Sequence, residues 1–331
     1  MREVCTRIVD QIAEDREQLM KKMVFEADSN AVATLSAFMY AGVGKKADID
    51  RYVECKKYFK KNVNVFSEMR GIAETIVITK MTLADDYGSY LEGVKTVYKK
   101  LRERHKLTAS PYMVMAAINI YEAGGVEQAD AIIDKFETVY KQMQASHPFL
   151  TDDEDRPFLS LMVTKNADLD RVTEEIDACY EASKKMSFSA EAMHTAAQVM
   201  SLNPKGVEEK VADLKDTMDA LKANKVKGAK YELMPVVAAL GLLPGTPESK
   251  AAEIKEISDY LQTKKGFKLL LDPAKRSMYA TLVYAIASVE GDNTMATVVN
   301  TAITNIILDE IITMIIMISA AQSAARSANS N

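Results

Sequence analysis

Tryptophan is absent from this chain of 331 residues, and histidine, cysteine, proline and glycine are scarce. The 13 glycines and 8 prolines fall below the usual share, and tight turns between strands depend on these residues, so an all-β fold is disfavoured. Few aromatic side chains are interleaved with basic ones, which argues against a surface that stacks nucleic-acid bases. Good helix formers, in contrast, are plentiful, and the composition predicts an all-α protein.

The charge and the cysteines narrow the class of protein further. The formal net charge of −5 gives no overall attraction to nucleic acid or to an anionic membrane. Cys5, Cys55 and Cys179 are odd in number and far apart, as in a cytosolic protein with reduced, packed thiols. Acidic residues within the first twenty positions argue against an ordinary signal peptide. We therefore expect a cytoplasmic protein with no nucleic-acid partner.

Similar endings close six charged segments, and they recur at spacings of 40, 42, 40, 38 and 42 residues. Between these segments lie more apolar, alanine-rich stretches such as 113–120 and 235–240. Glycine- and proline-containing loops, for example 243–247, separate the two kinds of segment. Each unit is therefore expected to be an apolar helix, a short loop and an amphipathic helix. The endings begin at Tyr58, Tyr98, Tyr140, Tyr180, Met218 and Tyr260.

Two helices in about 40 residues match the size of known helical repeat units. We predict an all-α, α-solenoid-like array of about seven helical hairpins, either open or curled toward an α/α toroid. The array would occupy residues 31–300, after an N-terminal capping helix in 1–30, and 326–331 would be a frayed tail. An apolar helix is expected in 301–325. Its uncharged run, 311–325, is shorter than the roughly 18–20 residues that span a bilayer.

This C-terminal helix has three interpretations. It is expected to be buried against the last hairpins or to mediate self-association in a homodimer, with membrane contact the least favoured of the three. Asp309 and Glu310 precede its apolar run, and charged residues are costly within lipid. No transmembrane span is predicted.

The amphipathic segments begin with acidic residues and end with basic ones. Acidic side chains near a helix N-terminus and basic ones near a C-terminus complement the helix dipole, which explains the pattern without any partner. If the hairpins stack in parallel, however, the basic endings would form an edge that could dock an acidic partner. The residues of this candidate interaction edge are Lys60, Lys61, Lys99, Lys100, Lys184, Lys185, Lys264 and Lys265.

The segment 147–157 is the most distinctive local feature. Its carboxylates, with one histidine, could bind a hard cation such as magnesium or calcium. The alternative is a solvated loop that caps the following helix, which has Pro157 near its start. The spacing lacks the glycine and terminal glutamate of a calcium-binding loop. The weak metal candidates are His147, Asp152, Asp153 and Asp155.

Recognised catalytic motifs are missing. There is no phosphate-binding glycine loop, nucleophile elbow or zinc-binding histidine pair, and His194 is interpreted as a core residue. No cofactor and no catalytic residue is predicted. The leading hypothesis is a non-enzymatic interaction scaffold with a protein partner or self-association, because helical arrays build extended binding surfaces. The alternative is an enzyme or a protein that binds a small molecule or metal in a cavity near 147–157.

Three stretches together resemble an uncharacterised bacterial family, domain of unknown function 4003, found chiefly in Gram-positive bacteria. They are 147–158, 264–280 and the isoleucine-rich C-terminus with its alanine and serine tail. The resemblance covers nearly the whole chain and implies a helical cytoplasmic protein. It implies no activity and provides no catalytic residue.

Overall fold

The computed structural model describes residues 1–23, 29–104, 110–146, 148, 150–164, 169–187, 189–226, 234–268 and 273–290. Within these ranges it contains 14 α-helices and two short 3₁₀ helices but no strand, which confirms the all-α prediction. The chain divides into two compact units, here called unit 1 and unit 2. Unit 1 comprises the described residues within Met1–Glu14, Gln142–Leu150 and Asp168–Glu310, and unit 2 comprises those within Asp15–Lys141 and Thr151–Ala167.

Apolar helices alternate along the chain with amphipathic helices. Helix α6 illustrates the first kind, since Tyr112 to Ile118 are all buried and the helix is apolar on every side. The apolar helices are α2 (Ser29–Gly42), α4 (Ile72–Leu83), α6 (Pro111–Gly124), α8 (Arg156–Thr164), α10 (Ala190–Ser201), α12 (Met234–Leu240) and α14 (Pro273–Glu290).

The amphipathic helices bury one face only. In α7 the buried residues Ile133, Phe136, Val139 and Met143 recur at spacings of three and four, as the sequence pattern predicts. These helices are α1 (Glu3–Lys22), α3 (Ile49–Asn62), α5 (Tyr87–Arg104), α7 (Ala129–Ser146), α9 (Leu169–Ser183), α11 (Val207–Ala223) and α13 (Pro247–Thr263). The 3₁₀ helices are η1 (Asp153–Asp155) and η2 (Lys184–Met186).

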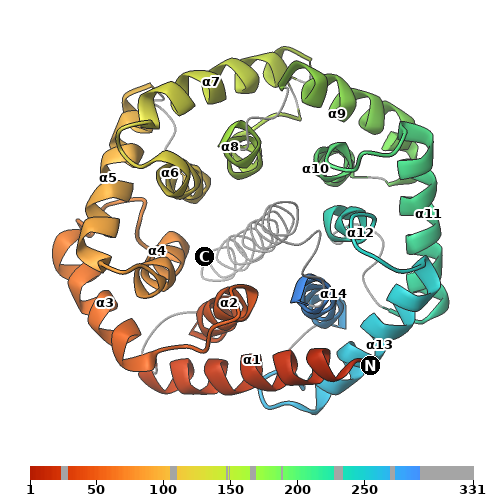
Figure 1. Ribbon diagram of the computed structural model, residues 1–331, viewed down its shortest axis with the longest axis horizontal. Coiled ribbons are helices and arrows are strands. Elements are labelled where there is room, and N and C mark those ends of the chain that lie inside the picture. Colours follow the sequence, from red (N-terminus) through yellow and green to blue (C-terminus); the bar gives the residue numbers. More distant parts are fainter. Residues whose placement is uncertain are drawn as a thin grey trace, which may run out of the picture. The chain divides into compact units, whose positions relative to one another are not determined.

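In unit 2, α2, α4, α6 and α8 pack in sequence order, and Figure 1 shows α3 and α5 outside α2, α4 and α6. Buried hydroxyl groups link neighbouring apolar helices. Thr79 of α4 donates a hydrogen bond to Ser36 of α2 at 2.9 Å, and Asn119 of α6 donates one to Ser160 of α8 at 3.0 Å. Because a buried polar group without a partner is costly, these pairs fix the register of adjacent helices.

In unit 1, α10, α12 and α14 pack in order, with α9, α11 and α13 against them. The first half of α1 also belongs to this unit. Arg2 forms an ion pair with Glu253 of α13 at 2.9 Å, and Tyr260 of the same helix donates a hydrogen bond to Asp10 at 3.0 Å. The chain's beginning therefore packs against residues about 250 positions later.

Short local signals define several helix starts. Asp48 accepts a hydrogen bond from the Arg51 N–H at 2.9 Å at the start of α3. Ser110 caps α6 and Thr246 caps α13 in the same way, each with a proline directly after it. Capping side chains satisfy amide groups that have no partner inside the helix.

The predicted helix in 301–325 and the tail 326–331 lie outside the described residues. Among the helices of the described part, none is long and apolar enough to cross a membrane.

Candidate functional site

The acidic segment predicted as a metal candidate forms η1 and the start of α8. The carboxylate of Asp155 accepts a hydrogen bond from the Asp152 N–H at 2.8 Å, and Asp153 forms an ion pair with Arg156 at 2.7 Å. The buried guanidinium of Arg156 also lies 4.4 Å from the centre of the Tyr140 ring. These contacts stabilise the start of α8 around the buried side chain of Arg156.

The metal prediction itself stays a prediction. His147 lies outside the described residues. In the ranges that the structure describes, no group of three or more His, Cys, Asp or Glu side chains is arranged to hold a metal ion.

The lysines of the interaction edge have different surroundings. Lys100 of α5 forms an ion pair with Asp130 at the start of α7 at 2.6 Å. Lys184 pairs with Glu181 and Lys264 with Asp10, each at 2.5 Å. The basic end of one amphipathic helix thus contacts acidic residues of the chain itself in these places. Exposed members of the set are Lys60, Lys61, Lys99, Lys184, Lys185 and Lys265, and their role as an edge stays a prediction.

His194 is buried, as the sequence analysis predicts. It is 1% exposed, and its ring packs edge-on against Tyr180 with 5.8 Å between ring centres. The structure thus supports a core histidine.

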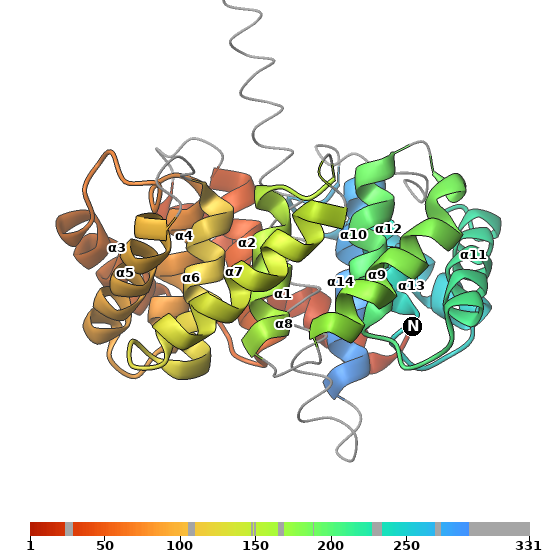
Figure 2. The ribbon, with the colours of Figure 1, turned by 90° about the horizontal axis from the view of Figure 1, so that it is seen from above.

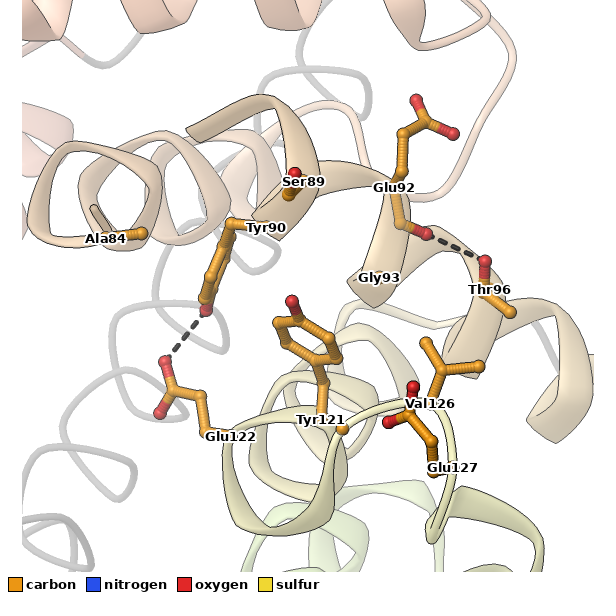
Figure 3. A pocket seen from close by; sticks show the side chains of 11 residues that line it. Ala84, Ser89, Tyr90, Glu92, Gly93, Thr96, Tyr121, Glu122, Val126 and Glu127 are labelled. Carbon is orange, nitrogen blue, oxygen red and sulfur yellow. Dashed lines mark hydrogen bonds between the residues drawn. The ribbon is translucent and has the colours of Figure 1, made fainter. Parts of the chain in front are cut away.

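A pocket in unit 2, here called the tyrosine pocket, gathers tyrosine and glutamate side chains that the sequence patterns do not bring together. It has a volume of about 720 Å³ and opens where α4 and α6 end and α5 and α7 begin. Figure 3 shows Tyr121 in its middle, between Tyr90 and Val126. The lining residues are Ala84, Ser89, Tyr90, Glu92, Gly93, Thr96, Tyr121, Glu122, Gly125, Val126 and Glu127.

Tyr121 is positioned by a glycine on the neighbouring helix. A Cβ at Gly93 would lie 2.1 Å from the Tyr121 ring, so the ring lies directly on the backbone of α5. Tyr90 meets the same ring edge-on, with 5.4 Å between ring centres. Such a pair of aromatic rings is favourable and holds the geometry of the pocket floor.

Glu122 is held by two donors from different helices. The Tyr90 hydroxyl donates a hydrogen bond to one carboxylate oxygen at 2.8 Å, and the Lys80 ammonium lies 2.9 Å from the other. Burial raises the pKa of Tyr90 well above its ordinary value, and the negative charge of Glu122 raises it further. Tyr90 therefore stays a neutral hydrogen-bond donor over the physiological range, and this corner of the pocket is fixed.

The other two carboxylates lie toward solvent. Glu127 follows a tight turn in which Gly125 has a φ of +63°, a conformation that glycine adopts without strain. Glu92 is exposed, and its carboxylate contacts Lys95 at 2.8 Å. Carboxylates beside a partly exposed aromatic face attract an ammonium or guanidinium group, through charge and through the electron-rich face of the ring.

Pattern analysis missed this pocket because its residues come from several segments. Tyr121 and Glu122 fall at the end of an apolar helix, directly before the Gly124–Gly125 turn. A polar and aromatic pair at that position is the one local signal that could have marked it. The closeness of Gly93 to Tyr121 has no signature in the sequence.

The model of one protein family, described as protein of unknown function (DUF4003), matches residues 17–312 of the chain. A search of curated proteins finds no significant match, and neither does a search of solved structures.

Proposed function

Since the chain belongs to the DUF4003 family, whose description assigns no activity, we propose a function from the pocket: the protein is a non-enzymatic scaffold of helical hairpins that holds a basic side chain of a partner protein at Tyr121. The observation that carries the proposal is the combination of the half-buried Tyr121 ring with the carboxylates of Glu122 and Glu127 in one pocket, with Glu92 at its rim.

The arrangement suits recognition better than proton transfer. Glu122 is already bound by Tyr90 and Lys80, so it serves as a fixed negative charge. Glu92 and Glu127 are exposed. In Figure 3 the Glu127 carboxylate lies beside the ring, whereas the Glu92 carboxylate points away from it at the rim of the pocket. A planar guanidinium could stack on Tyr121 while its N–H groups donate to a carboxylate. Arginine is therefore the side chain that the pocket fits best.

The proposed scaffold works in the cytoplasm. Cys5, Cys55 and Cys179 are free and buried, which suits a reducing compartment. The alternation of apolar and amphipathic helices supports a helical-repeat origin for the scaffold, since stacked hairpins present their loops and helix ends as binding surfaces.

The test is direct binding of a minimal probe. N-acetyl-arginine amide would be titrated into the protein at low salt and followed by ligand-observed NMR, with N-acetyl-citrulline amide as its uncharged counterpart. We expect weak binding of the arginine probe, with a Kd of about 1 mM, and no binding of citrulline. Tyr121→Leu and Glu127→Gln should each weaken it severalfold.

A matched control is Glu137→Gln, which removes a carboxylate from α7 outside the pocket and should leave binding unchanged. Equal binding of both probes, or arginine binding that survives Tyr121→Leu together with Glu127→Gln, would contradict the proposal.

A further inference from the structure

The loop between α3 and α4 exposes two adjacent apolar side chains. Val65 is 70% exposed and Phe66 is 91% exposed. Other large apolar side chains that the structure gives as exposed, such as Val43 at 49% and Val53 at 41%, are much less so. A fully solvated phenylalanine forgoes the favourable free energy of burying its ring, so its position at a loop tip calls for an explanation.

Hydrogen bonds hold this loop in one conformation. The guanidinium of Arg70 donates to the carbonyl oxygens of Val63 at 2.6 Å and Lys60 at 3.0 Å, and it contacts Glu74 at 3.3 Å. The Phe66 N–H donates to the Asn64 side chain at 2.9 Å. A preformed loop loses little conformational entropy on binding, which favours an anchoring role for its tip.

Exposed lysines lie just before the tip. Lys57, Lys60 and Lys61 occupy the last two turns of α3 and are exposed. Their positive field acts on a neighbour: Lys56 has a pKa lowered to about 8, first because of burial and then because of repulsion by Lys60. We call Lys57, Lys60, Lys61, Val65 and Phe66 the basic finger.

The tip of the basic finger and Ala84 of the tyrosine pocket lie at opposite ends of α4, whereas Glu92 lies nearer the end of α3, because its partner Lys95 also donates to the Asn62 carbonyl oxygen at 3.2 Å. The loop that carries Phe66 precedes α4, and Ala84 of the pocket follows it. The 12 residues of α4 separate them by about 18 Å. Figure 2 shows the orange loop between α3 and α4 at one end of these helices and the yellow turn between α6 and α7 at the other.

We infer that the basic finger of one copy docks into the tyrosine pocket of a second copy, with Phe66 against Tyr121 and the lysines near Glu92 and Glu127. This inference rests on the proposed function and names its partner. Phe66 and Tyr121 form an aromatic pair across the contact, and the positive charge of α3 meets the negative charge of the pocket. Both surfaces belong to unit 2.

The contact is heterologous, because each copy uses one surface as donor and a different one as acceptor. A heterologous contact leaves a free finger at one end of the assembly and a free pocket at the other. The wild-type protein should therefore form assemblies whose mass rises with concentration, up to a closed ring or an open chain. Salt should weaken them, since exposed charges are screened.

Sedimentation velocity over a range of protein concentrations tests this directly. Wild type should associate in low salt, and Phe66→Ser and the double variant E92K/E127K should each remain monomeric. An equimolar mixture of the two variants should give a dimer and nothing larger, because only one intact finger and one intact pocket remain. Val43→Ser, at another exposed apolar position, is the control and should associate as wild type does.

A fluorescent reporter gives a second measurement. The chain contains no tryptophan, so Phe66→Trp introduces a single reporter at the tip. Its emission should shift to the blue as the protein concentration rises, and E92K/E127K in the same chain should abolish the shift.

The inference is overturned if wild type remains monomeric at all concentrations, or if the mixed variants fail to form a dimer. If the protein binds the arginine probe but does not self-associate, the inference is wrong and the proposed function stands. If it neither binds the probe nor self-associates, the inference and the proposed function are both wrong. Binding of Phe66→Trp to vesicles of anionic phospholipid, with a blue shift but without self-association, would overturn it in favour of a membrane surface.

Discussion

The ring of Tyr121 on α6 occupies the space in which a side chain at Gly93 on α5 would begin. A Cβ at position 93 would lie 2.1 Å from the ring, 2.4 Å from its outer carbon and 2.8 Å from its hydroxyl oxygen. Non-bonded atoms do not approach so closely, so any other residue at position 93 must displace the ring. The shape of the pocket therefore depends on the lack of a Cβ at position 93.

Gly93→Ala should remove the pocket without unfolding the protein. Alanine favours a helix interior over glycine by about 0.5–1 kcal/mol, which offsets part of the packing lost when Tyr121 moves. We expect the free energy of unfolding to change by less than about 1 kcal/mol, while binding of the arginine probe falls at least as far as in Tyr121→Leu. Urea unfolding and ligand-observed NMR measure the two quantities.

The control for Gly93→Ala is Gly88→Ala in the same helix. A Cβ there would lie 3.2 Å from the Tyr58 hydroxyl, the far end of a flexible side chain, and Tyr121 would not be affected. Arginine binding should survive this change. Unaltered binding in Gly93→Ala would show that Tyr121 is not the site of recognition.

Arg156 is the polar residue whose loss should destabilise unit 2 the most. Its side chain is 3% exposed and pairs with Asp153, which is 29% exposed, and its guanidinium stacks on Tyr140. Arg156→Ala removes these contacts and leaves a cavity, so we expect the free energy of unfolding to fall by about 2–4 kcal/mol. Asp153→Asn keeps the cavity filled and should cost about 1 kcal/mol.

Lys215→Ala is the comparison for Arg156→Ala, since Lys215 forms an ion pair with Asp219 in which both side chains are more than 60% exposed. Exposed pairs contribute little, so the unfolding curve should barely move. If Arg156→Ala changed the free energy of unfolding as little as Lys215→Ala, the pair of Arg156 and Asp153 would not stabilise the fold. The acidic segment would then need another explanation.

The sequence predicts the helices better than it predicts their contacts. Periodic apolar residues locate α7, and Ile133, Phe136 and Met143 are buried there. In α11 the same reasoning misses Lys210, which is 3% exposed because its ammonium pairs with Glu175 of α9. A buried charge is costly unless a partner pairs with it, and the pattern of one helix cannot reveal a partner on another.

The candidate site was harder to predict for the same reason. The basic edge predicted from helix endings includes Lys60 and Lys61 but not the neighbouring Phe66, and that edge stays a prediction. Whether an apolar loop residue is exposed depends on the conformation of the loop. Here the hydrogen bonds from Arg70 fix that conformation, and the sequence does not reveal them. The pocket requires the approach of Gly93 to Tyr121, which depends on how α5 packs on α6.

The three thiols should be unreactive in the folded protein. Burial raises the pKa of Cys5 to about 12, with the charge of Glu253 adding to the effect, and burial raises the pKa of Cys55 and of Cys179 to about 11. The thiolate is the reactive form, so Ellman's reagent at pH 8 should label the native chain slowly and all three sites quickly in urea. Rapid labelling of a native thiol would show that its helix opens readily.

Lys56 should make the stability of the protein depend on pH in the alkaline range. Its pKa is about 8 in the folded chain, lowered from 10.5 by burial and by Lys60. The unfolded state therefore binds more protons than the folded state between these values, and stability rises with pH across that window. Below pH 8 both states are protonated, and the folded state bears the full cost of the buried charge.

Lys56→Met removes that cost, so it should be more stable than wild type at pH 7, with an advantage that shrinks as the pH rises from 8 toward 10.5. Urea unfolding at several pH values measures the difference. Lys57→Met, which removes one exposed positive charge from the same helix, controls for the change in net charge. Lys60→Gln should raise the pKa of Lys56 in the folded chain and so narrow the pH range over which stability rises. An advantage that stays constant with pH would mean that methionine stabilises by packing alone, and that the lysines of the basic finger exert no field on Lys56.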